Sequence, residues 1–212
     1  KLLLNFYRCY YAFVRGKVAS LRLAQREEAV ASRLDIMEKS EKYFDLAYTY
    51  AARVEKPVLI ITAGLMGSGK SYLAKEIGLR LGAAIIRLDA LRKEMSGIKP
   101  VDRRLESFGQ GIYDDATSRA AYDKACAMAA RLLENSRPAI IDASFRKRSE
   151  RQAAAALAQK LGVNFYVIEC VCAEEISKDR LERRIQENKD VSDGRWEIFA
   201  RQKQDFDAID EI

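Results

Sequence analysis

Residues 57–71 read PVLIITAGLMGSGKS, and this segment carries the strongest structural signal of the chain. Residues 57–63 are a short run of apolar and β-branched residues between a proline and a glycine, which is typical of a buried parallel strand. Residues 64–71 match the pattern G-x-x-x-x-G-K-S/T in full. A buried strand, a glycine-rich turn and the start of a helix therefore follow one another, which is the context of a phosphate-binding loop.

The chemistry of this loop predicts a site for a nucleoside triphosphate with Mg²⁺. Glycines let the backbone turn its amides inward around a phosphate, and the helix that follows adds the positive end of its dipole. Lys70 would reach the β- and γ-phosphates, and the Ser71 hydroxyl would coordinate Mg²⁺. The strand–loop–helix context speaks against a chance match. The residues that we expect to bind the nucleotide are Gly64, Met66, Gly67, Ser68, Gly69, Lys70, Ser71 and Tyr72.

Patterns of strands and helices alternate along the rest of the chain. Further strands are expected at 84–88, 138–142 and 164–169, and helices at 70–81, 114–135, 147–161, 174–188 and 193–207. Such alternation predicts an open, mainly parallel sheet with right-handed crossovers. The predicted fold class is α/β, a three-layer P-loop NTPase domain over residues 57–212. A sheet of this type often has one more strand after the last predicted helix. The sequence therefore leaves open whether the domain is clipped at its C-terminus.

Residues 1–56 differ from the rest of the chain, because they contain no Pro and only one Gly. Apolar and aromatic residues recur there at helical spacing, which predicts two long helices with a break around residues 25–28. The aromatics are dense for surface helices, so we expect them to contact either the following domain or a preceding part of the protein. The chain begins at Lys rather than Met, and we expect it to be a piece of something longer.

Charge and composition exclude several classes of protein. The net charge of +6 is concentrated in residues 1–56, which carry 11 basic against 7 acidic residues. The remainder is nearly balanced and lacks the basic surface of a protein that binds long nucleic acid. No apolar run is long enough to span a bilayer. Four cysteines without C-x-x-C spacing, and no histidine, favour free thiols over a disulfide framework or a zinc site. We therefore expect a cytoplasmic protein with no membrane partner.

Two aspartates lie at the ends of predicted strands. Asp89 follows the second strand and Asp142 ends the third, so both should face the phosphate loop. Asp89 can accept the proton of a substrate hydroxyl, with Arg92 on the same helical face, but a helix N-cap is an equally open alternative. Asp142 can hold Mg²⁺ through its water shell, or it can cap the loop after the strand.

Two groups of basic residues are candidates for contacts with phosphates or with the acceptor. Arg180 and Arg184 share a helical face and can close over the triphosphate as a lid, although a solvated surface is the usual alternative. The second group follows the Asp142 strand and can either contact an anionic acceptor or occupy the start of a helix. Its members are Arg146, Lys147, Arg148 and Arg151.

From Pro57 onward the chain resembles the small P-loop kinases related to polynucleotide 5′-hydroxyl kinases, gluconate kinase and zeta-type toxins. The motifs that carry the resemblance are GLMGSGKS, LDALR, IIDASF and RLERR followed by SDG. The resemblance implies ATP and Mg²⁺ as cofactors, with Asp89 as general base and Arg92 on the phosphate. It also implies Arg180 and Arg184 as lid arginines and Asp142 as the third-strand aspartate. Acceptors in the family range from sugars to nucleic-acid ends, so the acceptor stays open.

Residues 6–20, FYRCYYAFVRGKVAS, resemble the C-terminal helices of an aminoglycoside-phosphotransferase-like domain. In certain bacterial proteins such a domain precedes a P-loop kinase domain, so the resemblance implies an upstream partner domain.

Together the features of the chain predict a Mg-ATP-dependent kinase that acts on a hydroxyl of a small molecule or a nucleic-acid end. The alternative is a regulatory module that binds ATP, hydrolyses it slowly and controls a partner domain.

Overall fold

A computed structural model describes residues 2–23, 30–51, 57–98, 111, 114–187 and 196–210. The chain divides into two compact units, residues 1–55 with 77–83 and residues 56–76 with 84–212. The predicted break around residues 25–28 lies outside the described residues.

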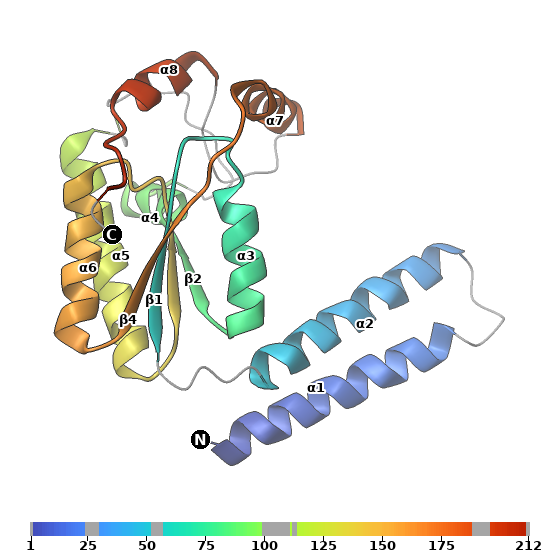
Figure 1. Cartoon of the computed structure of the whole chain (residues 1–212). Helices are drawn as coiled ribbons and strands as arrows, with labels where there is room; N and C mark the ends of the chain where they lie inside the picture. Colours follow the sequence, from blue (N-terminus) through green and yellow to red (C-terminus); the bar gives the residue numbers. More distant parts are fainter. Residues whose placement is uncertain are drawn as a thin grey trace. The chain divides into compact units, whose positions relative to one another are not determined.

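The N-terminal hairpin consists of α1 (Leu2–Leu23) and α2 (Val30–Ala51), which lie side by side in Figure 1. Gly16 lets the helices approach closely, because a Cβ there would lie 3.1 Å from the ring of Phe44. The Ser20 and Ser40 hydroxyls form a hydrogen bond of 2.6 Å with each other, and the Gly16 carbonyl oxygen lies 3.0 Å from the first and 3.2 Å from the second. The two predicted helices are therefore present, and small residues fill their contact.

Many large apolar side chains of the hairpin are exposed, and several of them are aromatic. The side chains of Phe6 and Tyr11 are 64% and 63% exposed. The other large exposed apolar residues of the hairpin are Leu4, Tyr7, Tyr10, Phe13, Val18, Leu21, Leu34, Met37, Phe44, Leu46 and Tyr48. Exposed apolar residues gathered in this number are typical of an interaction surface. We call these thirteen residues the hairpin surface.

The α/β part contains the predicted alternation of strands and helices. Its described elements, in chain order, are β1 (Val58–Ala63), α3 (Lys70–Leu81), β2 (Ala84–Arg87), α4 (Leu88–Met95), α5 (Asp115–Glu134), β3 (Ala139–Asp142), α6 (Arg148–Leu161), β4 (Asn164–Glu169), α7 (Glu174–Glu187) and α8 (Trp196–Gln204). The last helix ends at Gln204, before the predicted end at residue 207, and its predicted start at residue 193 lies outside the described residues.

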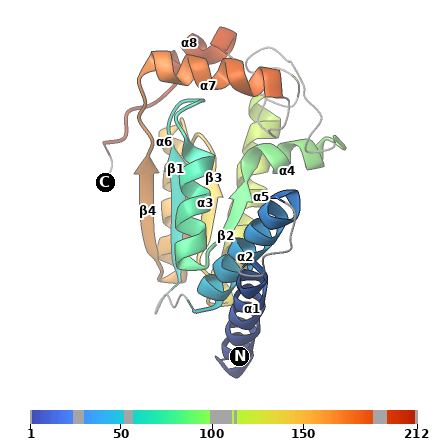
Figure 2. The same ribbon diagram turned by 90° about the vertical axis from the view of Figure 1, so that its right-hand side faces the viewer.

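The four strands form one parallel sheet in the order β2-β3-β1-β4. Figures 1 and 2 show α5 and α6 on one face of this sheet and α3 on the other. Every residue of β1 is buried because both faces of this central strand are covered. Alanines bring α5 and α6 close to the strands, and those in the core are Ala121, Ala125, Ala129, Ala154 and Ala158. The α/β fold class is confirmed.

The strand order places the loops after β1 and β3 next to each other. The chain leaves β1 toward α3 on one face, and it leaves β3 toward α6 on the opposite face (Figure 1). At such a switch point a crevice opens at the carboxyl ends of the two neighbouring strands, and ligands of parallel sheets bind there. Among the described residues, no helix is both long and apolar enough to cross a membrane.

Candidate active site

The loop after β1 requires glycine at both glycine positions of the motif, Gly64 and Gly69, and also at Gly67 between them. Gly64, Gly67 and Gly69 have φ values of 131°, 78° and 97°, a region that residues with a side chain rarely adopt. A Cβ on Gly64 would lie 2.4 Å from the carbonyl oxygen of Cys170, and one on Gly67 would lie 2.8 Å from that of Ser177. Backbone from two other segments therefore packs directly against the loop.

Hydrogen bonds from two neighbouring segments hold the outer part of the loop. The Gly64 N–H donates to the carbonyl of Ser144, in the loop after β3, over 3.1 Å. The N–H of Met66, one of the predicted nucleotide contacts, donates to Oε1 of Gln202 over 2.8 Å. Because α3 begins at Lys70, the amides of its first turn remain directed into the loop, as they are at any helix N-terminus.

The inner part of the loop fits a phosphate group. The Ser68 hydroxyl is buried and has no hydrogen-bond partner among the described residues. A buried polar group without a partner costs about 1–3 kcal/mol, and a phosphate oxygen in the loop would remove that cost. Lys70 Nζ donates to the Leu65 carbonyl over 2.6 Å, which places the ammonium at the loop. The Tyr72 side chain is 72% exposed, so its contribution to the site would be its backbone amide.

Asp142 lies at the end of β3 and is 6% exposed. Its carboxylate is hydrogen-bonded to the Ser71 hydroxyl, and Thr62 Oγ1 donates to its Oδ1 over 3.4 Å. A carboxylate beside a hydroxyl is a set of oxygen ligands that suits Mg²⁺. The described residues contain no group of three or more candidate metal-ligating side chains, so phosphates and water would supply the remaining ligands.

Several of the predicted site residues influence the pKa of Asp142. Burial is the largest influence and raises the pKa of its carboxyl. The hydrogen bond with Ser71 and the positive charges of Arg87 and Lys70 lower this pKa, whereas the charge of Asp89 raises it. Arg87 Nε lies 3.6 Å from Asp142 Oδ2. Both aspartates thus lie within electrostatic reach of each other and of the phosphate loop.

Asp89 lies in the first turn of α4 and is paired with Arg92. The N-cap of this helix is Arg87, so the alternative that Asp89 acts as the N-cap is wrong. Nη1 of Arg92 lies 3.1 Å from Oδ1 of Asp89. The Arg92 side chain is 10% exposed and that of Asp89 is 33% exposed. The nearly buried Arg92 therefore binds Oδ1 of Asp89, while part of the Asp89 carboxylate stays accessible to solvent.

One of the two predicted lid arginines lies at the phosphate loop. Nη1 of Arg180, in α7, donates to the Gly67 carbonyl over 3.2 Å and lies 3.6 Å from Sγ of Cys172. The side chain of Arg184 lies outside the described residues.

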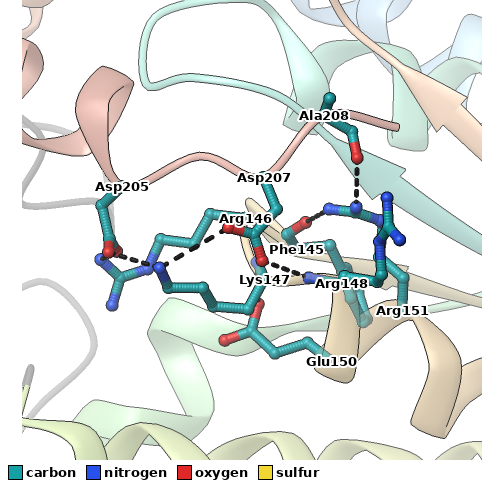
Figure 3. A network of polar contacts seen from close by, with 9 residues as sticks. All are labelled: Phe145, Arg146, Lys147, Arg148, Glu150, Arg151, Asp205, Asp207 and Ala208. Carbon is teal, nitrogen blue, oxygen red and sulfur yellow. Dashed lines mark hydrogen bonds and ion pairs between the residues drawn. The ribbon is translucent and has the colours of Figure 1, made fainter. Parts of the chain in front are cut away.

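The basic residues after β3 contact acidic residues of the C-terminal segment, a pairing that the sequence did not predict. Arg146 and Lys147 both bond to the carboxylate of Asp205, as Figure 3 shows. The Arg148 N–H donates to Oδ2 of Asp207 over 2.9 Å, and the Asp207 N–H donates to the Arg146 carbonyl over 2.8 Å. These five residues form what we call the C-terminal clasp. The alternating aspartates after α8 were the signal in the sequence that could have revealed it.

Arg151 is the buried member of the same basic group. It is 1% exposed, and its guanidinium donates to the carbonyls of Phe145 and Ala208 over 2.9 and 2.8 Å (Figure 3). Phe145 has a φ of 40°, and its N–H donates to the hydroxyl of Tyr122 over 3.2 Å. Burial raises the pKa of Tyr122 and keeps this hydroxyl neutral. Together these contacts fix the backbone that follows Asp142.

The fold and the site define an α/β domain with a parallel sheet and a phosphate-binding loop of the P-loop type. Residues 59–209 match the model of the family AAA_33, an AAA domain. Because this match covers more than half of the chain, the chain belongs to that family.

Known relatives differ in how much of the chain they match. The uncharacterized protein Rv2004c of Mycobacterium tuberculosis is 26% identical over 205 residues, which are 96% of this chain and 40% of that protein. The chain thus spans less than half the length of the curated relatives that it matches first. A shikimate kinase of Gloeobacter violaceus is 38% identical over 64 residues, 30% of this chain and 36% of that enzyme.

A solved structure has the same fold. The crystal structure of a putative kinase from Chloroflexus aurantiacus superimposes with a TM-score of 0.50 at 21% sequence identity. The superposition covers 62% of this chain and 69% of that one.

Proposed function

We propose that the protein is a kinase that transfers the γ-phosphoryl group of Mg-ATP to a hydroxyl of a small molecule or a nucleic-acid end. The observation that carries this proposal is the second carboxylate beside the phosphate loop. A loop with Ser71 and Asp142 accounts for nucleotide binding by itself. Asp89 is not needed for that task, yet it lies within reach of Asp142, is partly exposed and is held by Arg92.

Each residue has a role that follows from its position. Arg92 holds Oδ1 of Asp89, and the carboxylate accepts the proton of the acceptor hydroxyl as its oxygen attacks the γ-phosphorus. The new bond joins that oxygen to phosphorus, and the bond from phosphorus to the β–γ bridging oxygen breaks. Lys70 and Arg180 neutralise the negative charge that develops on the phosphate oxygens.

Ser71 and Asp142 would hold the magnesium ion. A magnesium ion held there would stabilise the negative charge of the phosphate groups. The similarity to a shikimate kinase in part of the chain supports a kinase. The four cysteines are free thiols, which supports a cytoplasmic location.

A screen with ATP labelled at the γ-phosphate, over metabolites with hydroxyl groups and 5′-hydroxyl oligonucleotides, tests the proposal. With an acceptor identified, Asp89→Asn is expected to lower the transfer rate by about 100-fold or more, because it removes the general base. The matched control is Asp115→Asn, an exposed aspartate in the first turn of α5. It removes the same charge from the same kind of helix position and should leave the rate unchanged.

Two results would contradict this assignment. Transfer by Asp89→Asn at the rate of the Asp115→Asn control would remove Asp89 from the mechanism. ATP binding without a phosphorylated product in any arm of the screen would favour a regulatory ATP-binding module instead.

For the hairpin surface we propose contact with an upstream phosphotransferase-like domain in a longer protein. The exposed aromatic residues of α1 and α2 support this proposal, because burying one such side chain contributes about 1.5–3 kcal/mol. A photo-crosslinking amino acid in place of Tyr11, in the intact protein, should capture a peptide from such a domain. Capture of only a second copy of the hairpin would contradict it.

A further inference from the structure

One contact links the middle of the phosphate loop to the C-terminal segment. Gln202, on α8, is 8% exposed, and its Oε1 accepts the N–H of Met66 over 2.8 Å. The two residues are 136 positions apart in the sequence. Met66 lies between the anchored Gly64 and the buried Ser68 hydroxyl, so this hydrogen bond sets the orientation of a peptide inside the loop.

The helix that carries Gln202 is held firmly at its C-terminal end. Asp205 directly follows the last residue of α8, and Arg146 and Lys147 each lie 2.5 Å from its carboxylate. Asp207 is joined to the same segment through its own N–H and through its side chain, as Figure 3 shows. The N–H of Arg148 holds the pKa of the Asp207 carboxyl below its usual range, so this carboxylate is charged at neutral pH.

The same helix is also tied to α7, which packs against the phosphate loop. Lys178 Nζ, on α7, lies 5.8 Å from the centroid of the Trp196 ring at the start of α8, and within α8 that ring stacks on the ring of Phe199 with centroids 4.6 Å apart. Lys203 forms an ion pair with Glu174 at the start of α7. The position of the Gln202 side chain therefore depends on the contacts that hold the whole of α8, as well as on its own rotamer.

We infer that Gln202 is a positioning residue for the phosphate loop, which it holds through the Met66 peptide while the C-terminal clasp holds α8. The inference rests on the proposed function only in naming ATP as the ligand of the loop. A carboxamide suits this role because it accepts the Met66 N–H without placing a negative charge beside the phosphates. A glutamate would make the same hydrogen bond but would repel the triphosphate.

The direct test compares two identical substitutions on one helix. Gln202→Met removes the acceptor and keeps the length of the side chain. Gln204→Met makes the same change at an exposed position two residues further on. Loss of one hydrogen bond should speed hydrogen exchange at the Met66 amide by about fivefold to tenfold in Gln202→Met only. The affinity for AMPPNP with Mg²⁺ should fall by a similar factor, with kcat at saturating ATP unchanged.

Two further variants separate this role from a merely structural one. Asp205→Asn weakens the clasp and should speed exchange at Met66 less than Gln202→Met does. Gln202→Glu keeps the acceptor, so exchange at Met66 should stay slow while AMPPNP binding weakens, most strongly at low salt. If Gln202→Met fails to fold, Gln202→Glu still tests the inference. Unchanged AMPPNP affinity of Gln202→Glu at low salt would overturn it.

Equal exchange at Met66 in Gln202→Met and Gln204→Met would also overturn it. The exchange measurement needs neither nucleotide nor acceptor. A failure to find phosphoryl transfer would therefore count against the proposed kinase activity and leave this comparison intact.

Discussion

Replacing Gly67 with alanine tests the closest approach between the phosphate loop and α7. Gly67 has a φ of 78°, and an added Cβ would lie 2.8 Å from the carbonyl oxygen and 3.1 Å from the Cα of Ser177. Both atoms belong to the backbone of α7, and Ser177 is 1% exposed. The overlap therefore cannot be relieved by a side-chain rotation, and either α7 or the loop must shift.

The expected loss of stability has two parts. A left-handed backbone costs about 1–2 kcal/mol for a residue with a Cβ. The overlap adds about 1–3 kcal/mol, as inserted atoms do in well-packed regions. For a chain of 212 residues, a total of about 2–5 kcal/mol should lower the melting temperature by about 10 °C. Because the shift moves the loop, AMPPNP affinity should also fall by at least about tenfold.

Gly162→Ala is the matched control. Gly162 has a φ of 64°, and a Cβ there would meet no atom within 4 Å. This variant carries the backbone strain of about 1–2 kcal/mol without the overlap, so it should lower the melting temperature by about 3–5 °C. Its AMPPNP affinity should equal that of the wild type. Thermal melts and AMPPNP titrations of the two variants in parallel decide the matter. Equal melting temperatures and equal affinities would refute the close packing of α7 on the loop.

Three further predictions concern buried and charged groups around the site. Asp142→Asn should weaken Mg²⁺ binding by about 10–100-fold yet raise the melting temperature of the nucleotide-free protein at pH 7. Burial raises the pKa of Asp142, so its ionised form opposes folding; calorimetry should find this gain at neutral pH and none below the ordinary pKa of an aspartate. Arg180→Ala should weaken AMPPNP binding by about tenfold in a salt-dependent titration, with an unchanged melting temperature because this side chain is exposed. Arg151→Met removes the donor from the buried Phe145 carbonyl and from the partly buried Ala208 carbonyl, and it should cost about 2–4 kcal/mol in urea unfolding; a change below about 0.5 kcal/mol would contradict the role of Arg151 in holding this backbone.

Features encoded by neighbouring residues could be predicted from the amino-acid sequence alone. The loop at residues 64–71 belongs to this group, because positive φ values and a helix start depend on glycine and on spacing within eight positions. The alternation of apolar strands with helices likewise predicted an α/β fold with a parallel sheet. The aspartates Asp89 and Asp142 could be placed at the carboxyl edge because parallel strands share that edge.

Features that depend on distant residues came only from the tertiary structure. The order β2-β3-β1-β4, which puts Asp142 beside Ser71, is one of several orders compatible with the same alternation. Local pattern could not separate a base from an N-cap at Asp89, and the position of the α4 N-terminus at Arg87 removed the second alternative.

The pairing of charges and polar groups was the least accessible to sequence reasoning. Arg146 and Asp205 are 59 positions apart, and Met66 and Gln202 are 136 positions apart. Any basic residue can pair with any acidic one, and any glutamine can accept a hydrogen bond from any amide. Composition and periodicity therefore do not indicate which residues form these pairs. The local sequence thus specified a phosphate loop between a strand and a helix. Only the packing of α7, α8 and the C-terminal clasp around it decided which side chains hold that loop, because those contacts exist only once the chain is folded.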